Sequence, residues 1–180
     1  MAAPLSVITQ WLKKTYPRPA VDPEWLEGCY SWIVEELQLD PSRDMKTILE
    51  NVDTQLLESD FADSMRSGSG IPPNAIGADE TMVIKGPILV EVVEIMEVGQ
   101  SAYSLLQVHE SRVEYQKQAQ IRTASGDPEE HKPMPKFPRS MLQLRLSDGQ
   151  HVITAVEHKS LPGIELGETP LGFKVSCRFN

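Results

Sequence analysis

Cysteine is scarce in this chain of 180 residues, which holds only Cys29 and Cys177. The two lie far apart and form neither a zinc-ligand spacing nor a disulfide framework, so we expect a reducing intracellular compartment. Long apolar runs are also missing, and no stretch approaches the length of a membrane span. Residues 1–5 lack a basic segment that leads into an apolar run, so we expect no secretory signal.

Positive charge is in deficit, because 17 Lys and Arg stand against 26 Asp and Glu for a net charge of −9. This balance argues against a protein that coats nucleic acid by charge alone. The sequence has no glycine-rich phosphate loop, nucleophile elbow or zinc-binding pair. Its histidines have no cysteine or carboxylate partners at ligand spacing; they are His109, His131, His151 and His158. We therefore predict a protein that is not an enzyme, with no catalytic residues, cofactor or bound metal.

The most regular pattern present is an alternation of apolar and polar residues, carried by Leu142, Leu144 and Leu146. This is the period of a β-strand with one buried face. Asp148-Gly149 then supplies the residues that a tight two-residue hairpin turn needs, and a second alternating strand follows. Because two strands alone are not stable in water, the hairpin predicts a larger sheet around it.

Residues 1–66 predict a three-helix bundle, because apolar side chains recur at helical spacing in three stretches separated by prolines. The second stretch begins at Asp22-Pro23, a capping side chain followed by proline at the first helical position. Large aromatic residues on such stripes are usually core residues. The predicted core residues of this bundle and of the hairpin are Trp11, Trp25, Leu26, Cys29, Trp32, Leu142, Leu144 and Leu146.

Residues 67–80 are rich in glycine, serine and proline and predict a flexible joint. Residues 88–98 have glutamates three apart, which allows a helix, but their β-branched content favours a bent strand. A further strand is predicted over 172–179. The fold class is therefore α+β, with a three-helix bundle followed over 81–180 by a small β-barrel, for which the OB-fold is one option.

A long connection over about 107–138 separates the first two predicted strands and shows no sustained period of either kind. Between Ser111 and Ser140 it holds six Lys and Arg against four Asp and Glu. We interpret it as a mobile loop, either a solvated tether or a segment that becomes ordered on a partner. The residues that we expect to contact a partner are Arg112, Lys117, Ile121, Arg122, Lys132, Met134, Lys136 and Phe137.

Four motifs narrow this general description, and together they resemble the RecQ-mediated genome instability protein 1 family over nearly the whole chain. Two lie in the predicted helices and two in the predicted barrel, in the order that the family has them. They are Trp25-Leu-Glu-Gly-Cys-Tyr-Ser-Trp32, Gln55-Leu-Leu-Glu-Ser-Asp60, Val90-Glu-Val-Val-Glu-Ile-Met-Glu-Val-Gly-Gln-Ser-Ala-Tyr103 and Pro138-Arg-Ser-Met-Leu-Gln-Leu-Arg-Leu-Ser-Asp-Gly149.

This resemblance implies an OB-fold in a non-catalytic scaffold subunit located in the nucleus. The family joins a type IA topoisomerase of the topoisomerase III class to a RecQ-family helicase, in a complex that dissolves double Holliday junctions. Its insertion between the first two barrel strands reaches into the topoisomerase and influences the DNA gate. Residues 111–137 match that insertion by position, so we expect DNA contact mainly through the partners.

The chain departs from the family pattern in one respect, because only four of the five strands of an OB-fold can be placed before Asn180. We expect a barrel that is incomplete at its C-terminus, as in a fragment or in a protein that borrows its last strand. Two other functions stay open at this stage. One is a single-stranded DNA-binding OB-fold, which the acidic charge and the few outward aromatic residues disfavour, and the other is a related adaptor for different partners.

Overall fold

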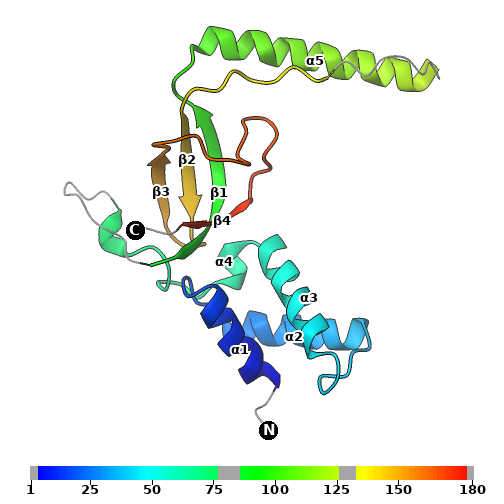
Figure 1. Ribbon diagram of the computed structural model, residues 1–180, viewed down its shortest axis with the longest axis vertical. Helices are drawn as coiled ribbons and strands as arrows, with labels where there is room; N and C mark the ends of the chain where they lie inside the picture. Colours follow the sequence, from blue (N-terminus) through cyan, green and yellow to red (C-terminus); the bar gives the residue numbers. More distant parts are fainter. Residues whose placement is uncertain (1–3, 77–85, 126–132, 178–180) are drawn as a thin grey trace. The chain divides into compact units, whose positions relative to one another are not determined.

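The computed structural model describes residues 4–76, 86–125 and 133–177 and shows an α+β chain, as predicted (Figure 1). Helices come first, and strands follow with one long helix between the first two. In chain order the elements are α1 (Pro4–Thr15), α2 (Pro23–Glu36), α3 (Met45–Glu58), α4 (Phe61–Ser64), the 3₁₀ turn η1 (Pro73–Ala75), β1 (Ile88–Glu97), α5 (Ala102–Ser125), β2 (Leu142–Ser147), β3 (Val152–Val156) and β4 (Lys174–Cys177).

The three predicted helices of the N-terminal module are present, and a fourth, short helix follows them. Asp22 caps α2 as expected, because its side chain accepts hydrogen bonds from the backbone N–H groups of Glu24 and Trp25. Asp60 caps α4 in the same way, through the N–H of Ala62. Apolar side chains from all four helices form one buried core. Its fully buried members include Ile8, Ile33, Ile48, Val52, Leu56 and Phe61.

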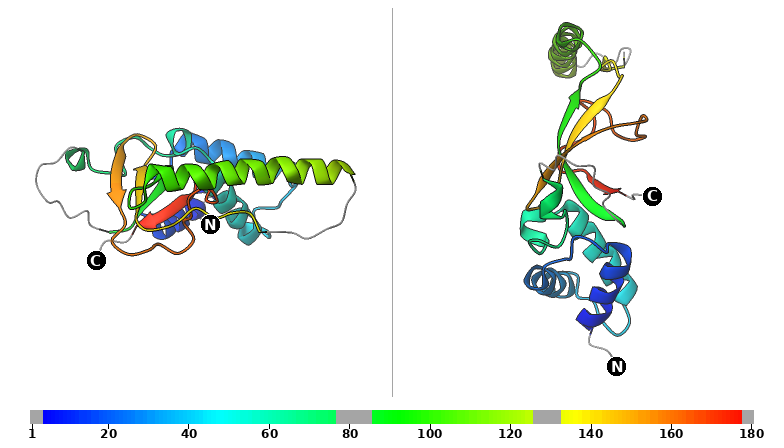
Figure 2. Two further views of the ribbon diagram at one scale, coloured as in Figure 1. Left: turned by 90° about the horizontal axis from the view of Figure 1, so that it is seen from above. Right: turned by 90° about the vertical axis from the view of Figure 1, so that its left-hand side faces the viewer.

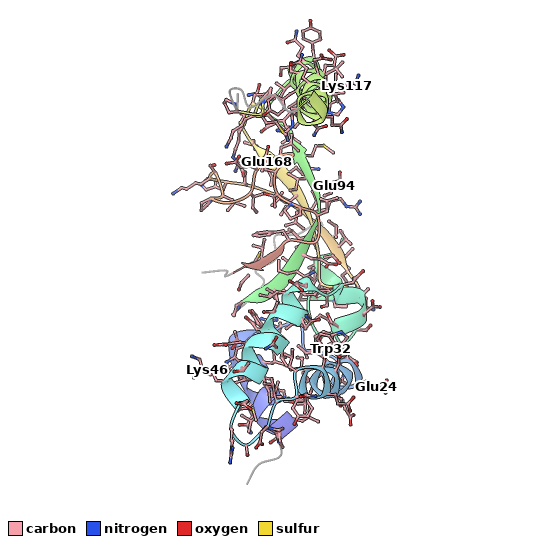
Figure 3. All side chains as sticks on the ribbon, turned by 90° about the vertical axis from the view of Figure 1, so that its right-hand side faces the viewer. Glu24, Trp32, Lys46, Glu94, Lys117 and Glu168 are labelled. Carbon is pink, nitrogen blue, oxygen red and sulfur yellow. The ribbon has the colours of Figure 1, made fainter. Side chains whose placement is uncertain are left out.

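The prediction that five residues of α1 and α2 form the core is only partly right. Leu26 is buried, whereas Trp11, Trp25 and Cys29 are half-buried at the margin of the core. The prediction that Trp32 is a core residue is wrong, because 51% of this residue is exposed. Figure 3 labels it on α2. The reason is the rotation of α2: the helix packs through the side that carries Leu26 and Ile33, and a second apolar line beside it faces outward.

The sheet has four strands among the described residues, in the order β3-β2-β1-β4. Residues 88–97 form a strand, so the helical alternative for this segment is wrong. The leucines at 142, 144 and 146 are buried, as their alternation predicted. Strands β3 and β4 stand at the two edges, and the barrel is therefore unclosed, which agrees with the incomplete OB-fold expected from the sequence.

Strand β4 joins the sheet to the helices through one buried lysine, Lys174. It pairs antiparallel with β1, which places Lys174 opposite Glu91. Lys174 Nζ lies 2.8 Å from Glu91 Oε2 and donates a hydrogen bond of 2.7 Å to the carbonyl of Ser59. The same ammonium group lies 4.2 Å from the ring centroid of Phe61. Since the two charged side chains are at most 10% exposed, this pair is part of the interior.

The hairpin turn between β2 and β3 lies one residue later than predicted. The backbone N–H of Asp148 donates to the carbonyl of His151, so Gly149 and Gln150 are the central residues. Gly149 has φ +94°, a conformation that favours glycine. Its α-carbon faces the backbone of Phe61 so closely that an added Cβ would lie 2.2 Å from the carbonyl oxygen. The turn therefore packs directly on α4.

The structure describes residues 67–76 of the predicted flexible joint, and this part contacts the hairpin turn. Ile71 is buried, and its backbone N–H donates to the carboxylate of Asp148. His151 Nδ1 lies 3.2 Å from the carbonyl oxygen of Ile71. The flexibility of this joint stays a prediction. Residues 77–80 lie outside the described residues.

The insertion between β1 and β2 is the part of the chain whose structure differs most from the prediction. Residues 107–138 were predicted to be a mobile loop, but α5 covers 102–125 as one long helix (Figure 2). The Ser101 hydroxyl accepts from the N–H of Ser104 at the helix start, and Gln118 donates to Glu114 one turn earlier. Its half-buried residues recur at helical spacing, a period that the sequence prediction did not recognise; they include Leu105, Val108, Arg112, Tyr115 and Ala119.

Contacts divide the chain into two compact units. The first consists of 1–94, 145–155 and 171–180, and holds the helical module with the hairpin turn and β4. The second consists of 95–144 and 156–170 and holds α5. It also holds residues 133–141, which lead back from α5 to β2 and which we call the returning segment. The domain division predicted from the sequence, into 1–66, 67–80 and 81–180, stays a prediction.

Candidate functional site

The most distinctive feature of the second unit is Arg112, which ties α5 to two other segments. Its Nη1 donates to the carbonyl of Pro135 at 2.9 Å and to Glu168 Oε1 at 2.8 Å. Its Nη2 donates to the carbonyl of Gly167 at 3.1 Å, and the guanidinium stands 5.1 Å from the ring centroid of Phe137. Because only 11% of the side chain is exposed, the bonds to the charged group are strong ones.

A second tie joins the returning segment to the loop before β4. Lys136 Nζ lies 3.1 Å from Glu165 Oε2, and both side chains are at least half exposed. An exposed pair of this kind contributes at most about 1 kcal/mol. The Phe137 ring packs against Gly167, where an added Cβ would come within 2.7 Å of it. Apolar contact and the Arg112 bonds therefore hold the returning segment against this loop.

Both ends of the insertion meet at Glu97, the last residue of β1. Its Oε1 accepts from the backbone N–H groups of Gly99 at 2.7 Å and Met141 at 2.9 Å, and its Oε2 accepts from Ser140 at 2.8 Å. Burial alone raises the pKa of this carboxyl, but the three N–H donors and the nearby Arg139 outweigh burial and lower it. The ionised Glu97 thus holds together the two ends of the insertion, residues 97–99 and 140–141, which we call the neck.

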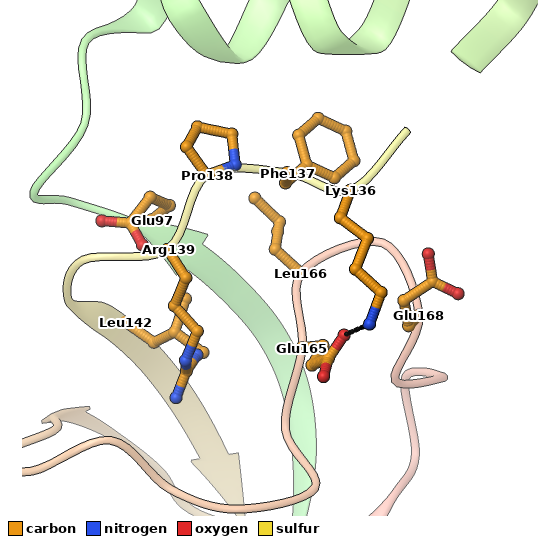
Figure 4. Close-up of a pocket in the computed structure, with 9 residues that line it drawn as sticks. All are labelled: Glu97, Lys136, Phe137, Pro138, Arg139, Leu142, Glu165, Leu166 and Glu168. Carbon is orange, nitrogen blue, oxygen red and sulfur yellow. Dashed lines mark hydrogen bonds and ion pairs between the residues drawn. The ribbon is translucent and has the colours of Figure 1, made fainter. Parts of the chain in front are cut away.

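A pocket of about 160 Å³ lies beside this neck (Figure 4). Lys136 pairs with Glu165 there, Glu168 pairs with Arg112, and Glu97 is bound by backbone N–H groups. A carboxylate that is already paired is a poor general base, so the pocket suits a side chain of a partner better than a reaction. Its lining residues are Glu97, Lys136, Phe137, Pro138, Arg139, Leu142, Glu165, Leu166 and Glu168.

The side of α5 opposite Arg112 carries three large apolar side chains that are each more than half exposed. Tyr103 is 69% exposed, Leu106 51% and Ile121 68%. They share one face of the helix with Lys117, since their spacings of three, eleven and four residues are near whole turns. Figure 3 shows Lys117 on this helix. We call these four residues the outer face of α5 and identify it as the candidate interaction site.

The predicted partner-contacting residues separate into three groups. Arg112, Lys136 and Phe137 are brought together, but as internal ties of the insertion. Lys117 and Ile121 lie on the outer face of α5, and Met134 is half-buried on the returning segment. Lys132 and the side chain of Arg122 lie outside the described residues. Contact of any of these residues with a partner stays a prediction.

Sequence reasoning missed Tyr103 and Leu106 because it placed the start of the insertion at 107. A helix-start signal was present in Ser101, which is followed by residues of good helix propensity. Had the stretch been assigned as a helix, the spacing of Tyr103, Leu106 and Ile121 would have identified one apolar face. The information was therefore in the sequence, but it depended on the correct period.

Within residues 4–76, 86–125 and 133–177, no three His, Cys, Asp or Glu side chains gather in a way that could hold a metal ion. In the same residues, no helix combines the length and the apolar character that crossing a membrane requires.

Comparison with known protein families gives two matches that together cover most of the chain. Residues 12–64 match the family model described as RMI1, N-terminal helical domain. Residues 71–180 match the model described as RMI1, N-terminal OB-fold domain. The two matches follow the order of the helical module and the sheet in the structure.

Curated proteins named RecQ-mediated genome instability protein 1 are similar to the chain over almost all of its length. The protein of Mus musculus is 29% identical over 174 residues, which cover 95% of this chain and 26% of that protein. The protein of Danio rerio is 25% identical over 92% of this chain and 30% of its own length. The protein of Oryza sativa subsp. japonica is 24% identical over 99% of this chain and 18% of its own length. The chain thus spans less than a third of each of these relatives.

Proposed function

The chain belongs to the RMI1 family, and from this premise we propose that it is a non-catalytic scaffold subunit that joins a type IA topoisomerase of the topoisomerase III class to a RecQ-family helicase. An RMI1-type role in genome stability follows from the family. The finer proposal is that the complex dissolves double Holliday junctions in the nucleus, and that the chain meets DNA mainly through its partners. The names of the relatives support the link to RecQ.

The observation that carries this proposal is the way in which α5 is held. Glu97 closes its neck, and Arg112 ties its inner side to the returning segment and to Gly167. These contacts use the polar groups of the insertion internally and leave Tyr103, Leu106 and Ile121 uncovered. A helix that is ordered before binding loses less entropy when a partner covers it. The insertion is therefore suited to binding a protein through its outer face.

The pocket beside the neck supports a scaffold over an enzyme. Its carboxylates are occupied by Lys136, by Arg112 and by backbone N–H groups. Catalysis by acid and base groups needs a pair with separated pKa values and free access to a substrate. What this pocket offers is apolar surface from Phe137, Leu142 and Leu166, beside carboxylates that are already paired.

The test is reconstitution of the chain with a topoisomerase III and a RecQ-family helicase. We expect the chain to elute with both partners in gel filtration, and to raise the rate at which they resolve a double Holliday junction substrate. Because the chain is acidic, we expect no sub-micromolar binding to a single-stranded oligonucleotide at physiological salt. Failure to bind either protein, with salt-sensitive binding to the oligonucleotide, would favour a single-stranded DNA-binding function instead.

A further inference from the structure

The first unit carries a second uncovered apolar surface, on α2. Trp32 is 51% exposed, and Trp25, seven residues before it, is half-buried on the same side of the helix. Gly28 lies between the two, since positions 25, 28 and 32 are one turn apart in succession. We call these three residues the aromatic face of α2. Tryptophan is enriched among the residues that dominate binding energy at protein interfaces.

Packing inside the fold does not explain why position 28 is a glycine. Glycine weakens the interior of a helix relative to alanine. An added Cβ at Gly28 would meet no atom within 4 Å, so no close internal packing requires the missing side chain. The backbone of α2 is therefore open between the two tryptophans. Such an opening allows another backbone or a bulky side chain to approach closely.

The surroundings of the aromatic face are acidic. Glu24, Glu35 and Glu36 are exposed on α2, and none of them forms an ion pair with a described residue. Residues 1–66 as a whole hold twelve Asp and Glu against six Lys and Arg. Opposite charge steers association and excludes wrong partners, so a segment that binds here should be basic. Lys or Arg can also stack on the exposed tryptophan ring.

We propose that the aromatic face of α2 docks a basic amphipathic helix of the RecQ-family helicase. This inference rests on the proposed function, because a scaffold that joins two proteins needs two separate surfaces. The outer face of α5 belongs to the second compact unit, and the aromatic face of α2 belongs to the first. An apolar side chain of the incoming helix fits over Gly28 between the tryptophans, and its Lys and Arg face the glutamates.

The experiment measures the affinity of the full chain for the helicase and for the topoisomerase separately, by biolayer interferometry. The variants are Trp32→Ala, which removes the ring, and Gly28→Gln, which fills the opening. Thr47→Gln, on the exposed side of α3, is the matched control. Circular dichroism melts should show that all three fold, since each position is exposed.

We expect Trp32→Ala and Gly28→Gln each to weaken helicase binding by about 30-fold, as loss of a central interface residue does. Thr47→Gln should leave it unchanged, and topoisomerase binding should be unchanged in all variants. Helicase binding that survives both substitutions, or a loss of topoisomerase binding in their place, would overturn the docking face and leave the scaffold function intact. An unchanged chain that does not bind the helicase would contradict the scaffold function as well.

Discussion

Glu97 Oε1 accepts the backbone N–H of Met141 at 2.9 Å, and this bond joins the end of β1 to the start of β2. The chain leaves the sheet at the first residue, passes through α5, and returns at the second. The carboxylate accepts from Gly99 and Ser140 as well, so one side chain fixes both ends of the insertion. The base of α5 is therefore set by a single buried charge.

Replacing Glu97 with glutamine should destabilise the fold. The amide keeps the size of the side chain but loses the charge, and its NH₂ group opposes one of the three N–H donors. Hydrogen bonds to charged groups contribute about 1.5–3 kcal/mol, so we expect Glu97→Gln to lower the free energy of unfolding by roughly that amount. Urea denaturation measures it. A change within about 0.5 kcal/mol, typical of surface substitutions, would show that Glu97 does not hold the neck.

The contribution of Glu97 should depend on pH in a defined direction. Its pKa is lowered in the folded chain from an ordinary value of 4.5. Its stabilisation is therefore complete above the unfolded pKa and is lost as pH falls through the folded pKa. The difference in Tm between the unchanged chain and Glu97→Gln should stay constant from pH 7 to pH 5 and shrink below about 4. A difference that grows on acidification would contradict the assignment.

Lys174 and Glu91 should be strongly coupled. Removing the ammonium with Lys174→Ala leaves Glu91 buried beside the helices without its partner, and breaking a buried pair costs about 3–5 kcal/mol. The double variant Lys174→Met with Glu91→Gln should recover much of this loss, because it leaves no uncompensated charge. A double-mutant cycle built from Lys174→Met, Glu91→Gln and their combination gives the coupling by chemical denaturation. A loss in the double variant equal to the sum of the two single losses would show that the pair is not coupled.

Truncation should destabilise the fold much more at Ile33 than at its neighbour Trp32. Ile33 is fully buried, so Ile33→Ala should lower the free energy of unfolding by about 2–5 kcal/mol. Trp32 is half exposed, so Trp32→Ala should change it by less than about 1 kcal/mol. Thermal melts of the two variants compare them directly. A larger loss for Trp32 would place the tryptophan in the core, as its spacing first suggested.

The sequence predicted the elements whose period is unambiguous. Leu142, Leu144 and Leu146 alternate without interruption, and Asp22-Pro23 combines two start signals, so the structure confirms both. The prediction that Trp32 is buried was wrong because α2 carries two apolar lines side by side. The composition of a helix does not say which of the two faces the core. The position of that core depends on contacts with α1 and α3, far away in the sequence.

The prediction of a mobile loop for the insertion was wrong for a different reason. Leu105, Val108 and Tyr115 do recur at helical spacing, but polar and charged residues, Arg112 among them, interrupt the pattern, so the period was not recognised. Arg112 was expected to contact a partner because it is charged and lies in the insertion. Its bonds to Pro135, Gly167 and Glu168 connect segments 23 to 56 residues apart. Only the tertiary structure brings these groups together.

The central claim is that the outer face of α5 binds the topoisomerase, and one double variant tests it. Leu106→Gln with Ile121→Gln removes two exposed apolar groups, while glutamine keeps the helix propensity. Gln116→Ala, exposed on another side of α5, is the control. The measurement is the affinity of the full chain for topoisomerase III, together with its stimulation of decatenation. We predict at least a tenfold loss of affinity (~1.4 kcal/mol) for the double variant and none for the control. Unchanged binding and stimulation by the double variant would contradict the account.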